Sequence, residues 1–299
     1  MIDAATELQQ TEPLTLRERL EAFVELTKPR IAITLVLTAA AAFYIGSAGR
    51  FDLPLFFHSM LGILLLAFGV ASLNQWMERE TDALMLRTQD RPIPSGRLSA
   101  TQAFLFGLAL CILAEFYLLV FVNQLTALLG LVVIVGYVLI YTPLKVRTPY
   151  STAIGAVPGA MPPLLGWAAA SGEVSLGGWI LFGVMVFWQY PHFLAIALLY
   201  KDDYARAGIK MLPVVENSGN ATARQMILFA SALLPLSLAP YLIGLGGYVF
   251  LIGALILGIW YLVETVRATR SRTDRLYRKL ILVSIVYLPV YFLLLVLGA

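Results

Sequence analysis

The sequence contains little charge and few of the side chains that bind soft metals. Only 13% of its 299 residues are charged, and it has one cysteine and two histidines. The single cysteine excludes a disulfide framework and a cysteine-based metal site. Because soluble globular domains are about a quarter charged, the composition also excludes a soluble enzyme, a disordered tail and a protein that binds nucleic acid.

Apolar residues are abundant and occur in long runs. They make up 60% of the chain, and the mean hydropathy is +0.82. A helix needs about 17–25 apolar residues to cross a bilayer. Nine such runs predict an all-α integral membrane protein, with nine transmembrane helices in a bundle around a central cavity. The runs lie near residues 31–48, 55–74, 101–122, 124–141, 150–171, 177–199, 225–244, 246–266 and 280–298.

The positions of the basic residues predict the orientation of these spans. Of the 21 lysine and arginine residues, all but Arg50 lie before the first span or after an even-numbered span. Cytoplasmic loops are enriched in lysine and arginine. We therefore predict a cytoplasmic N-terminus and a C-terminus on the outer side.

The whole chain, residues 1–299, is predicted to form one membrane domain. Its first 30 residues lack the apolar core of a signal peptide. Thr15 and Glu18 have the spacing of a capping box at the start of a helix. Apolar residues then recur on one helical face, which is typical of a helix lying on a membrane surface. We therefore expect residues 1–30 to form a segment on the cytoplasmic surface.

A row of oxygen-bearing side chains follows the second apolar run. Asn74, Glu78 and Asp82 are spaced four residues apart, so on an α-helix they lie along one face. Such a row at the mouth of a helix bundle suits Mg²⁺, which proteins usually hold with one or two carboxylates together with substrate phosphates. The spacing alone also fits a solvated helix end with scattered charge.

Basic residues near this row favour a site for metal and phosphate. Arg87 and Arg91 follow the row in a proline-stiffened segment, and arginine binds phosphate through paired hydrogen bonds. Lys145 and Arg147 follow the fourth span, on the same predicted side. This pair either contacts phosphate as well or simply marks the cytoplasmic side.

A second acidic loop follows the sixth span. It contains Asp202, Asp203 and Tyr204. An even number of spans separates this loop from the first acidic row, so both lie on the same side of the membrane. The sequence therefore predicts that acidic and basic groups from several loops meet at the cytoplasmic mouth of one cavity.

Taken in order, these motifs resemble a known family. The pattern Asn74-x₃-Glu78-x₃-Asp82 is similar to the first aspartate-rich motif of the membrane aromatic prenyltransferases, the 4-hydroxybenzoate polyprenyltransferase superfamily. Further segments narrow the resemblance to the protohaem IX farnesyltransferase (haem O synthase) family, over residues 25 to 215. These segments are Leu26–Arg30, Met85–Gly96, Tyr141–Thr148, Gly159–Trp167, Trp188–Phe193 and Asp203–Pro213.

The resemblance implies a reaction and its surroundings. A farnesyl group passes from farnesyl diphosphate to a vinyl group of haem B, water adds, and haem O and diphosphate are released. The family also implies Mg²⁺ as a cofactor, the lipid bilayer of a bacterial cytoplasmic (inner) membrane, and haem A synthase or a terminal oxidase assembly as a downstream partner.

The resemblance also implies roles for individual residues. The implied catalytic residues are Asn74, Glu78, Asp82, Asp202, Asp203 and Tyr204. The implied Mg²⁺ ligands are Asn74, Glu78, Asp82 and Asp203. The implied substrate-binding residues are Arg87, Arg91, Tyr141, Lys145, Arg147, Trp188 and His192.

The sequence departs from the superfamily pattern in both acidic motifs. Glu78 stands where the first motif usually has aspartate, and its additional methylene favours an indirect contact with the metal. In the second motif, Tyr200 and Tyr204 occupy the spaced acidic positions and leave only Asp202 and Asp203. The pattern therefore supports a first Mg²⁺ more strongly than a second.

His192 has two interpretations. It lies inside the sixth span, one turn after Trp188. An imidazole in apolar surroundings needs a hydrogen-bond partner or a metal, so the sequence alone favours a histidine satisfied within the core. The resemblance implies instead that it faces the haem, whose iron commonly binds imidazole. Asp202 lies about 15 Å further along an ideal helix, a gap that the width of a haem partly covers.

Two other functions fit parts of the sequence. A protein of the same fold could prenylate an aromatic quinone precursor, although the segments Trp188–His192 and Met211–Pro213 favour haem. A membrane transporter would also have broken helices around a polar site. The acids and arginines of this chain lie in predicted loops rather than at mid-membrane, which disfavours transport.

Overall fold

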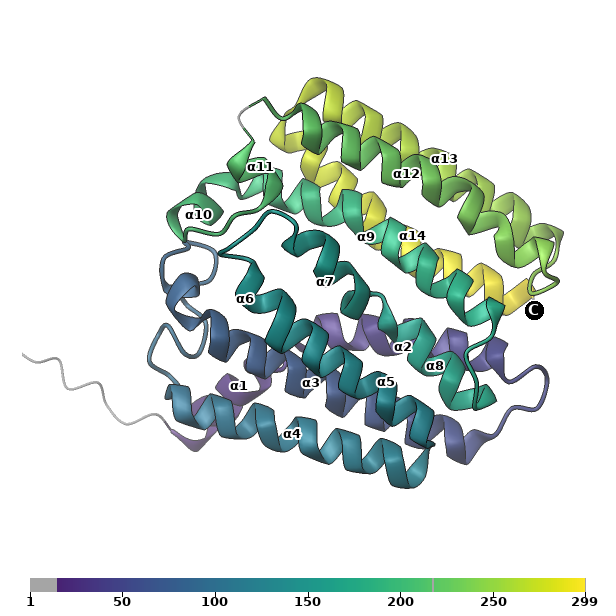
Figure 1. The fold of residues 1–299 in the computed structure, drawn as a ribbon, viewed down its shortest axis with the longest axis horizontal. Helices are drawn as coiled ribbons and strands as arrows, with labels where there is room; N and C mark the ends of the chain where they lie inside the picture. Colours follow the sequence, from purple (N-terminus) through teal and green to yellow (C-terminus); the bar gives the residue numbers. More distant parts are fainter. Residues whose placement is uncertain (1–14, 217, 299) are drawn as a thin grey trace, which may run out of the picture.

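Every regular element of the protein is helical within the described residues. The computed structural model describes residues 15–216 and 218–298, and its elements run from α1 to α14 with one π-helical segment, η1 (Figure 1). Within these ranges, nine helices or broken helices are long and apolar enough to cross a membrane. The predicted all-α fold with nine spans is therefore confirmed.

Seven of the spans are single helices and two are interrupted. The single helices are α2 (Pro29–Gly46), α3 (Leu53–Ala83), α4 (Ala100–Phe121), α9 (Leu176–Leu199), α12 (Asn220–Leu242), α13 (Tyr248–Ser271) and α14 (Asp274–Gly298). The interrupted spans are α5 (Gln124–Ile134) with η1 (Val135–Tyr141) and α6 (Thr142–Leu144), and α7 (Ser151–Gly159) with α8 (Met161–Ser171). Three short helices lie outside the spans: α1 (Leu16–Leu26), α10 (Lys201–Arg206) and α11 (Leu212–Val215).

Local sequence signals explain where several helices begin and end. Ser99 forms a capping box at the start of α4. Asn123 separates α4 from α5, and its side chain accepts a hydrogen bond from the backbone N–H of Thr126 at 2.8 Å. In the fifth span, Pro162 begins a new helix directly after α7 ends at Gly159, because proline suits a first turn and disrupts a helix interior. The fifth span is therefore made of two helices, α7 and α8.

The second span is longer than its apolar run. We predicted a span near residues 55–74, but α3 continues to Ala83. The continuation carries good helix formers and polar groups that find partners, so the helix does not end where the apolar residues do. Asn74, Glu78 and Asp82 consequently lie on a helix rather than in a loop.

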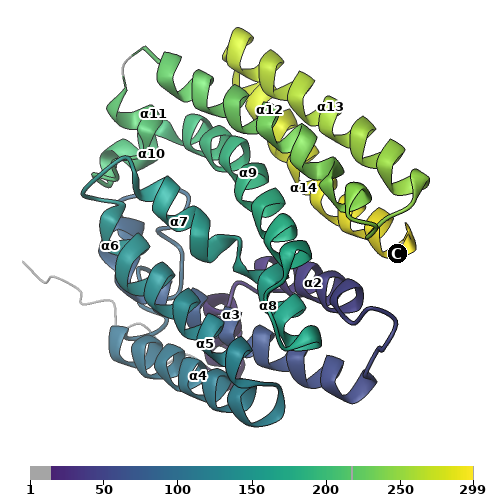
Figure 2. The same ribbon diagram turned by 45° about the vertical axis from the view of Figure 1, so that its right-hand side comes forward.

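The spans form two groups joined by three central helices. Helices α12, α13 and α14 lie on one side of the bundle, and α3, α4 and α5 lie on the other (Figure 2). Between them, α2 packs against both α8 and α14, and α9 packs against α12 and α14. Apolar side chains form one core within each group, and both cores include buried residues of α2 and α8.

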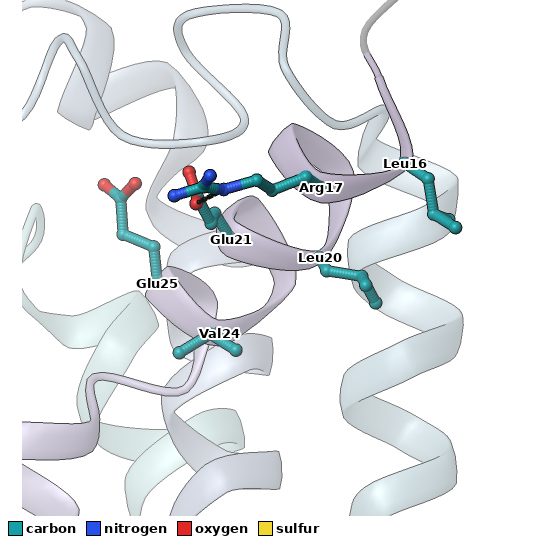
Figure 3. A pocket seen from close by; sticks show the side chains of 6 residues that line it. All are labelled: Leu16, Arg17, Leu20, Glu21, Val24 and Glu25. Carbon is teal, nitrogen blue, oxygen red and sulfur yellow. Dashed lines mark hydrogen bonds and ion pairs between the residues drawn. The ribbon is translucent and has the colours of Figure 1, made fainter.

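Most of the short helices and polar loops lie at one end of the bundle. Helices α1, α10 and α11 lie near the end at which α3 meets the loop before α4, whereas the chain ends at the opposite end, beyond α14 (Figure 1). Helix α1 begins with the predicted capping box of Thr15 and Glu18. Its two faces differ, with Leu16, Leu20 and Val24 on one and Arg17, Glu21 and Glu25 on the other (Figure 3).

Candidate active site

The oxygen-bearing row on α3 meets three basic side chains from three other parts of the chain. The ammonium of Lys28 donates to Asn74 Oδ1 at 2.9 Å. Lys145 Nζ lies 2.6 Å from Glu78 Oε1, and Arg91 Nη1 lies 2.6 Å from Asp82 Oδ2. Asn74 and Asp82 are buried, at 2% and 0% exposure. The structure therefore assembles an enclosed, charged cluster, which excludes the alternative of a freely solvated helix end.

Lys28 is a member of this cluster that we did not predict. It precedes Pro29, the first residue of α2, and its backbone is left-handed, with φ of 49°. Non-glycine residues seldom adopt this conformation, and here it directs the side chain towards α3. The sequence signal for Lys28 lay in the segment Leu26–Arg30, where this lysine immediately precedes a proline that starts a helix.

The cluster contains more basic side chains than carboxylates. Lys28 bonds a neutral amide, whereas Lys145 and Arg91 each pair with a carboxylate. Burial and the neighbouring charge of Arg91 lower the pKa of Lys28 to about 7, with a smaller contribution from Lys145. Lys28 is therefore only partly charged near neutral pH, and an anion bound beside it would favour its charged form.

Lys145 differs from Lys28 because it has a carboxylate partner. Burial alone would lower its pKa, but the ion pair with Glu78 outweighs burial, and the pKa lies well above its usual range. Lys145 also lies over the ring of Tyr141, 4.6 Å from the ring centroid. This arrangement keeps Lys145 charged at the end of the fourth span.

The end of the fourth span is shaped by the π-helical segment η1. Its wider turns place Tyr137 and Tyr141 together, with ring centroids 5.0 Å apart. Thr142 follows, accepts a hydrogen bond from Asn74 Nδ2 at 3.2 Å and donates to the Tyr137 carbonyl at 2.9 Å. Tyr137 and Thr142 are further residues of the site that sequence reasoning missed, because a π-helix has no clear sequence signal.

Asp203 connects the second acidic loop to the segment that follows the row on α3. Its carboxylate oxygens accept hydrogen bonds from the backbone N–H groups of Leu86 at 3.4 Å and Arg87 at 3.3 Å, and it pairs with Arg206. The Arg87 guanidinium lies over the ring of Tyr200 at 5.0 Å from its centroid. Asp203 therefore holds the loop that carries Arg87.

Several predicted residues lie at the edge of this cluster. Tyr204 accepts a hydrogen bond from Arg87 Nη2 at 3.4 Å. Asp202 is exposed. Arg147 is exposed too, and among the described residues it makes no ion pair. The structure brings Lys145, but not Arg147, to the row on α3.

The donor set on α3 fits Mg²⁺. Asp82 Oδ1 is buried and has no hydrogen-bond partner within the described residues. No group of three or more His, Cys, Asp or Glu side chains gathers as a metal site in those residues. Two carboxylates and an amide nevertheless form the kind of incomplete set that Mg²⁺ uses when phosphate oxygens supply further ligands. Asp203 fits less well, because backbone amides and Arg206 already occupy its oxygens.

Trp188 and His192 lie on α9. In the sequence they are distant from the residues of the charged cluster, and in the structure both contact α14. Trp188 Nε1 donates to the Ser284 carbonyl at 2.9 Å, and His192 Nδ1 lies 2.6 Å from Ser284 Oγ. The two rings are stacked, with centroids 5.1 Å apart. His192 thus has the hydrogen-bond partner that apolar surroundings demand.

Comparison with known proteins gives a consistent result. The model of the UbiA prenyltransferase family matches residues 35–295. The chain is 44% identical over 279 residues to the protoheme IX farnesyltransferase of Solibacter usitatus, covering 90% of this chain and 96% of that protein. It is 39% identical over 271 residues to the protoheme IX farnesyltransferase of Aquifex aeolicus, covering 90% and 92%.

Solved structures share the fold at low sequence identity. A structure described as digeranylgeranylglyceryl phosphate synthase superposes with a TM-score of 0.76 at 17% identity, covering 94% of this chain and 98% of the other. A UbiA homologue from Archaeoglobus fulgidus bound to GPP and Mg²⁺ superposes with a TM-score of 0.68 at 18% identity, covering 92% and 99%. At this identity the likeness establishes the fold alone.

Proposed function

The chain belongs to the UbiA prenyltransferase family, and from this premise we propose that it is a membrane farnesyltransferase that converts haem B to haem O. The observation that carries the proposal is the similarity, 39–44% over about 90% of the chain, to proteins named protoheme IX farnesyltransferase. The charged cluster on α3 supports it, because its basic side chains outnumber its carboxylates, which suits a diphosphate.

The diphosphate of farnesyl diphosphate is proposed to bind at this cluster. It carries up to three negative charges. Lys28, Arg91 and Lys145 can each turn from an oxygen of the α3 row to a phosphate oxygen, and Arg87 and Arg147 would extend the contact from the loops. Charge-assisted hydrogen bonds of this kind are about twice as strong as neutral ones. Tyr204 and Asp203 keep Arg87 in place.

Mg²⁺ is proposed as the cofactor, held by Asn74, Glu78 and Asp82, with Asp203 as a candidate for a second ion. When bound, it supplies positive charge against the leaving diphosphate. The basic side chains that now bond this row would then be free to bond the substrate. They are Lys28, Lys145 and Arg91. The chain's own cations would therefore stabilise the charge that develops as the bond breaks.

The reaction breaks the bond between farnesyl C1 and its oxygen, and the electron pair leaves with diphosphate. The vinyl group of haem B supplies the electrons for the new carbon–carbon bond. Water then adds to the remaining vinyl carbon and releases a proton, which gives haem O. Tyr137 and Tyr141 lie beside Lys145, where aromatic faces can stabilise an allylic cation.

The haem is proposed to lie deeper in the bundle, against α9, with Trp188 and His192 facing it. Both substrates are largely apolar, so a bilayer-embedded site suits them. We place the protein in the cytoplasmic membrane of a bacterium, with haem A synthase or a terminal oxidase as the downstream user of haem O. An aromatic quinone precursor is the alternative acceptor.

One assay tests the proposal. Purified protein is supplied with farnesyl diphosphate, Mg²⁺ and either haem B or 4-hydroxybenzoate, and the products are identified by mass spectrometry. We expect haem O from haem B, and no product when EDTA removes Mg²⁺. Prenylated 4-hydroxybenzoate in place of haem O would show a different acceptor, and the absence of either product would contradict the proposed activity.

A further inference from the structure

A glutamine lies buried near the middle of α9. Gln189 is 3% exposed and lies ten residues before the end of the helix, about 15 Å along its axis. Its Nε2 donates to the carbonyl oxygen of Ala156, on α7, at 2.8 Å. A glutamine amide donates only through its nitrogen and accepts only through its oxygen. This hydrogen bond therefore fixes the orientation of the amide and directs Oε1 away from the Ala156 carbonyl.

Hydrogen bonding within the protein does not account for both ends of this amide. The Ala156 carbonyl already accepts the backbone N–H of Ala160 at 3.1 Å, so it would be paired without Gln189. Oε1 accepts no hydrogen bond from the described residues, and protein atoms of those residues do not seal it. Because an acceptor inside a bilayer meets little bulk water, Oε1 is available to a polar ligand of the site.

Helix α7 connects Gln189 to the charged cluster. It lies between α6 and α9 in Figure 2 and packs against both η1 and α9. The ring of Tyr141, over which Lys145 lies, packs directly against Gly155. A Cβ on Gly159 would lie 2.7 Å from Gln189 Oε1. The two glycines are one helical turn apart, about 6 Å, so the Tyr141 ring and Oε1 meet successive turns of α7.

The two proposed substrates meet beside this amide, since farnesyl C1 is proposed to lie next to Tyr141 and haem B against α9. When C1 bonds to the terminal vinyl carbon, the vinyl carbon attached to the porphyrin ring is left with a positive charge. Water can then bond to that carbon and leave a hydroxyl group, or the adjacent carbon can lose a proton and restore the double bond. Haem O forms only by the first route, so the site must place water at this carbon.

We propose that Gln189 is a positioning residue that holds this water through Oε1 and so directs the reaction to hydration instead of proton loss. The water donates one hydrogen to Oε1, and a lone pair of its oxygen forms the bond to the charged carbon. Its surplus proton passes to diphosphate, the other product, because an amide is not among the side chains that act as bases. The proposal rests on the proposed function, since it requires haem B as the acceptor.

Product analysis of Gln189→Leu tests the proposal. Leucine has a similar size but no acceptor oxygen. The purified variant receives farnesyl diphosphate, Mg²⁺ and haem B, and its products are identified by mass spectrometry. We expect a new product that is lighter than haem O by one water molecule. The ratio of haem O to this product should fall at least about tenfold, the effect of one lost hydrogen bond. A purely structural role would lower the total yield and leave the ratio unchanged.

Gln75 provides a matched control for the same substitution. It is 2% exposed, and its Nε2 also donates to a backbone carbonyl, that of Leu26, at 3.0 Å. Its Oε1, however, is sealed by protein atoms and has no hydrogen-bond partner within the described residues. It therefore cannot hold a water molecule for the reaction. Gln75→Leu should make haem O without the lighter product, whatever its total yield.

Gly159→Ala tests the same position without removing the amide. The added methyl group would meet Oε1 and displace the flexible end of Gln189, so the lighter product should appear here too. This variant decides the matter if Gln189→Leu makes neither product. In that case, a Gly159→Ala variant that makes haem O alone, or no product, would overturn the inference.

The wild type separates this inference from the proposed function. If wild type and Gln189→Leu both make haem O without the lighter product, the inference is overturned and the function stands. A wild type that makes no haem O would overturn the function, and the inference with it.

Discussion

Each basic side chain of the charged cluster has one partner in the structure and a second, proposed partner on the substrate. In the structure, each of these basic side chains bonds an oxygen of the row on α3. The pairs are Lys28 with Asn74, Lys145 with Glu78, and Arg91 with Asp82. A bound metal and diphosphate would exchange these contacts, with oxygens turning to the metal and cations to phosphate. The exchange would be complete before the bond breaks, so the cations would need no further reorganisation as charge develops on the diphosphate.

Asp82→Asn is expected to abolish transfer while the protein still folds. Asparagine keeps the size of the side chain and an oxygen for Arg91, but it removes the charge that a metal ligand needs. We expect product formation, measured by mass spectrometry, to fall by roughly 100-fold or more. Glu80→Gln is the matched control, because Glu80 lies two residues earlier on α3, is highly exposed and pairs only with Arg79. Wild-type turnover in Asp82→Asn would remove Asp82 from the metal site.

Lys145→Ala and Arg147→Ala should differ in their effect on the affinity for farnesyl diphosphate. Lys145 is largely buried and faces Glu78, whereas Arg147 is exposed. Loss of one charge-assisted contact costs about 1.5–3 kcal/mol, or roughly 10- to 150-fold in affinity. We expect this loss by calorimetric titration for Lys145→Ala and a smaller one for Arg147→Ala. Unchanged affinity in Lys145→Ala would mean that Lys145 only pairs with Glu78.

At the scale of elements, a loop residue rather than the helix itself caps the start of α12. Glu216 accepts hydrogen bonds from the backbone N–H groups of Ala221 and Thr222, and from the hydroxyl groups of Ser218 and Thr222. Burial raises the pKa of Glu216, but these hydrogen bonds together outweigh it and lower the pKa to about 2. The carboxylate form is therefore the one that caps the helix.

Glu216→Ala should reduce the free energy of unfolding by about 1 kcal/mol at pH 7, the usual contribution of a helix cap. Since the folded pKa lies below the unfolded value of about 4.3, the stabilisation is complete above the unfolded pKa. It is lost as the pH falls towards about 2. Thermal unfolding in detergent between pH 7 and 3 measures this. A wild type and a Glu216→Gln variant with the same pH dependence would contradict the assignment.

At the scale of the whole molecule, an odd number of spans would place α1 and the end of α14 on opposite sides of the membrane. Helices α1 and α10 lie at one end of the bundle and the end of α14 at the other (Figure 1), and the charged cluster lies at the C-terminal end of α3. The distribution of basic residues predicts that the cluster faces the cytoplasm. Substrate diphosphate, which cannot cross the bilayer unaided, would then be bound on the side where it is available.

Thiol labelling in intact cells tests this orientation. The native thiol of Cys111 is buried, so introduced cysteines can be followed against a silent background. Glu173→Cys, between α8 and α9, should react with a membrane-impermeant maleimide from outside. Arg275→Cys, at the start of α14, should react only after the cells are permeabilised. The reverse pattern would contradict the predicted orientation.

Much of the fold follows from short-range properties of the sequence. Apolar length identifies the spans, Asn123 and Ser99 begin helices, and Pro162 breaks the fifth span. The row on α3 is likewise a matter of spacing along one helix. These features depend on residues within a few positions of one another, so local physical chemistry decides them.

The composition of the site depends on contacts between distant parts of the chain. Only the tertiary structure shows that Lys28 meets Asn74, and that Asp203 holds the backbone of Arg87. His192 likewise finds its hydrogen-bond partner in Ser284, which is 92 residues away in the chain. The sequence by itself determined the nine spans and the chemistry available at their ends. Which cation meets which oxygen was decided by helix packing, because that packing alone brings these side chains within hydrogen-bonding distance.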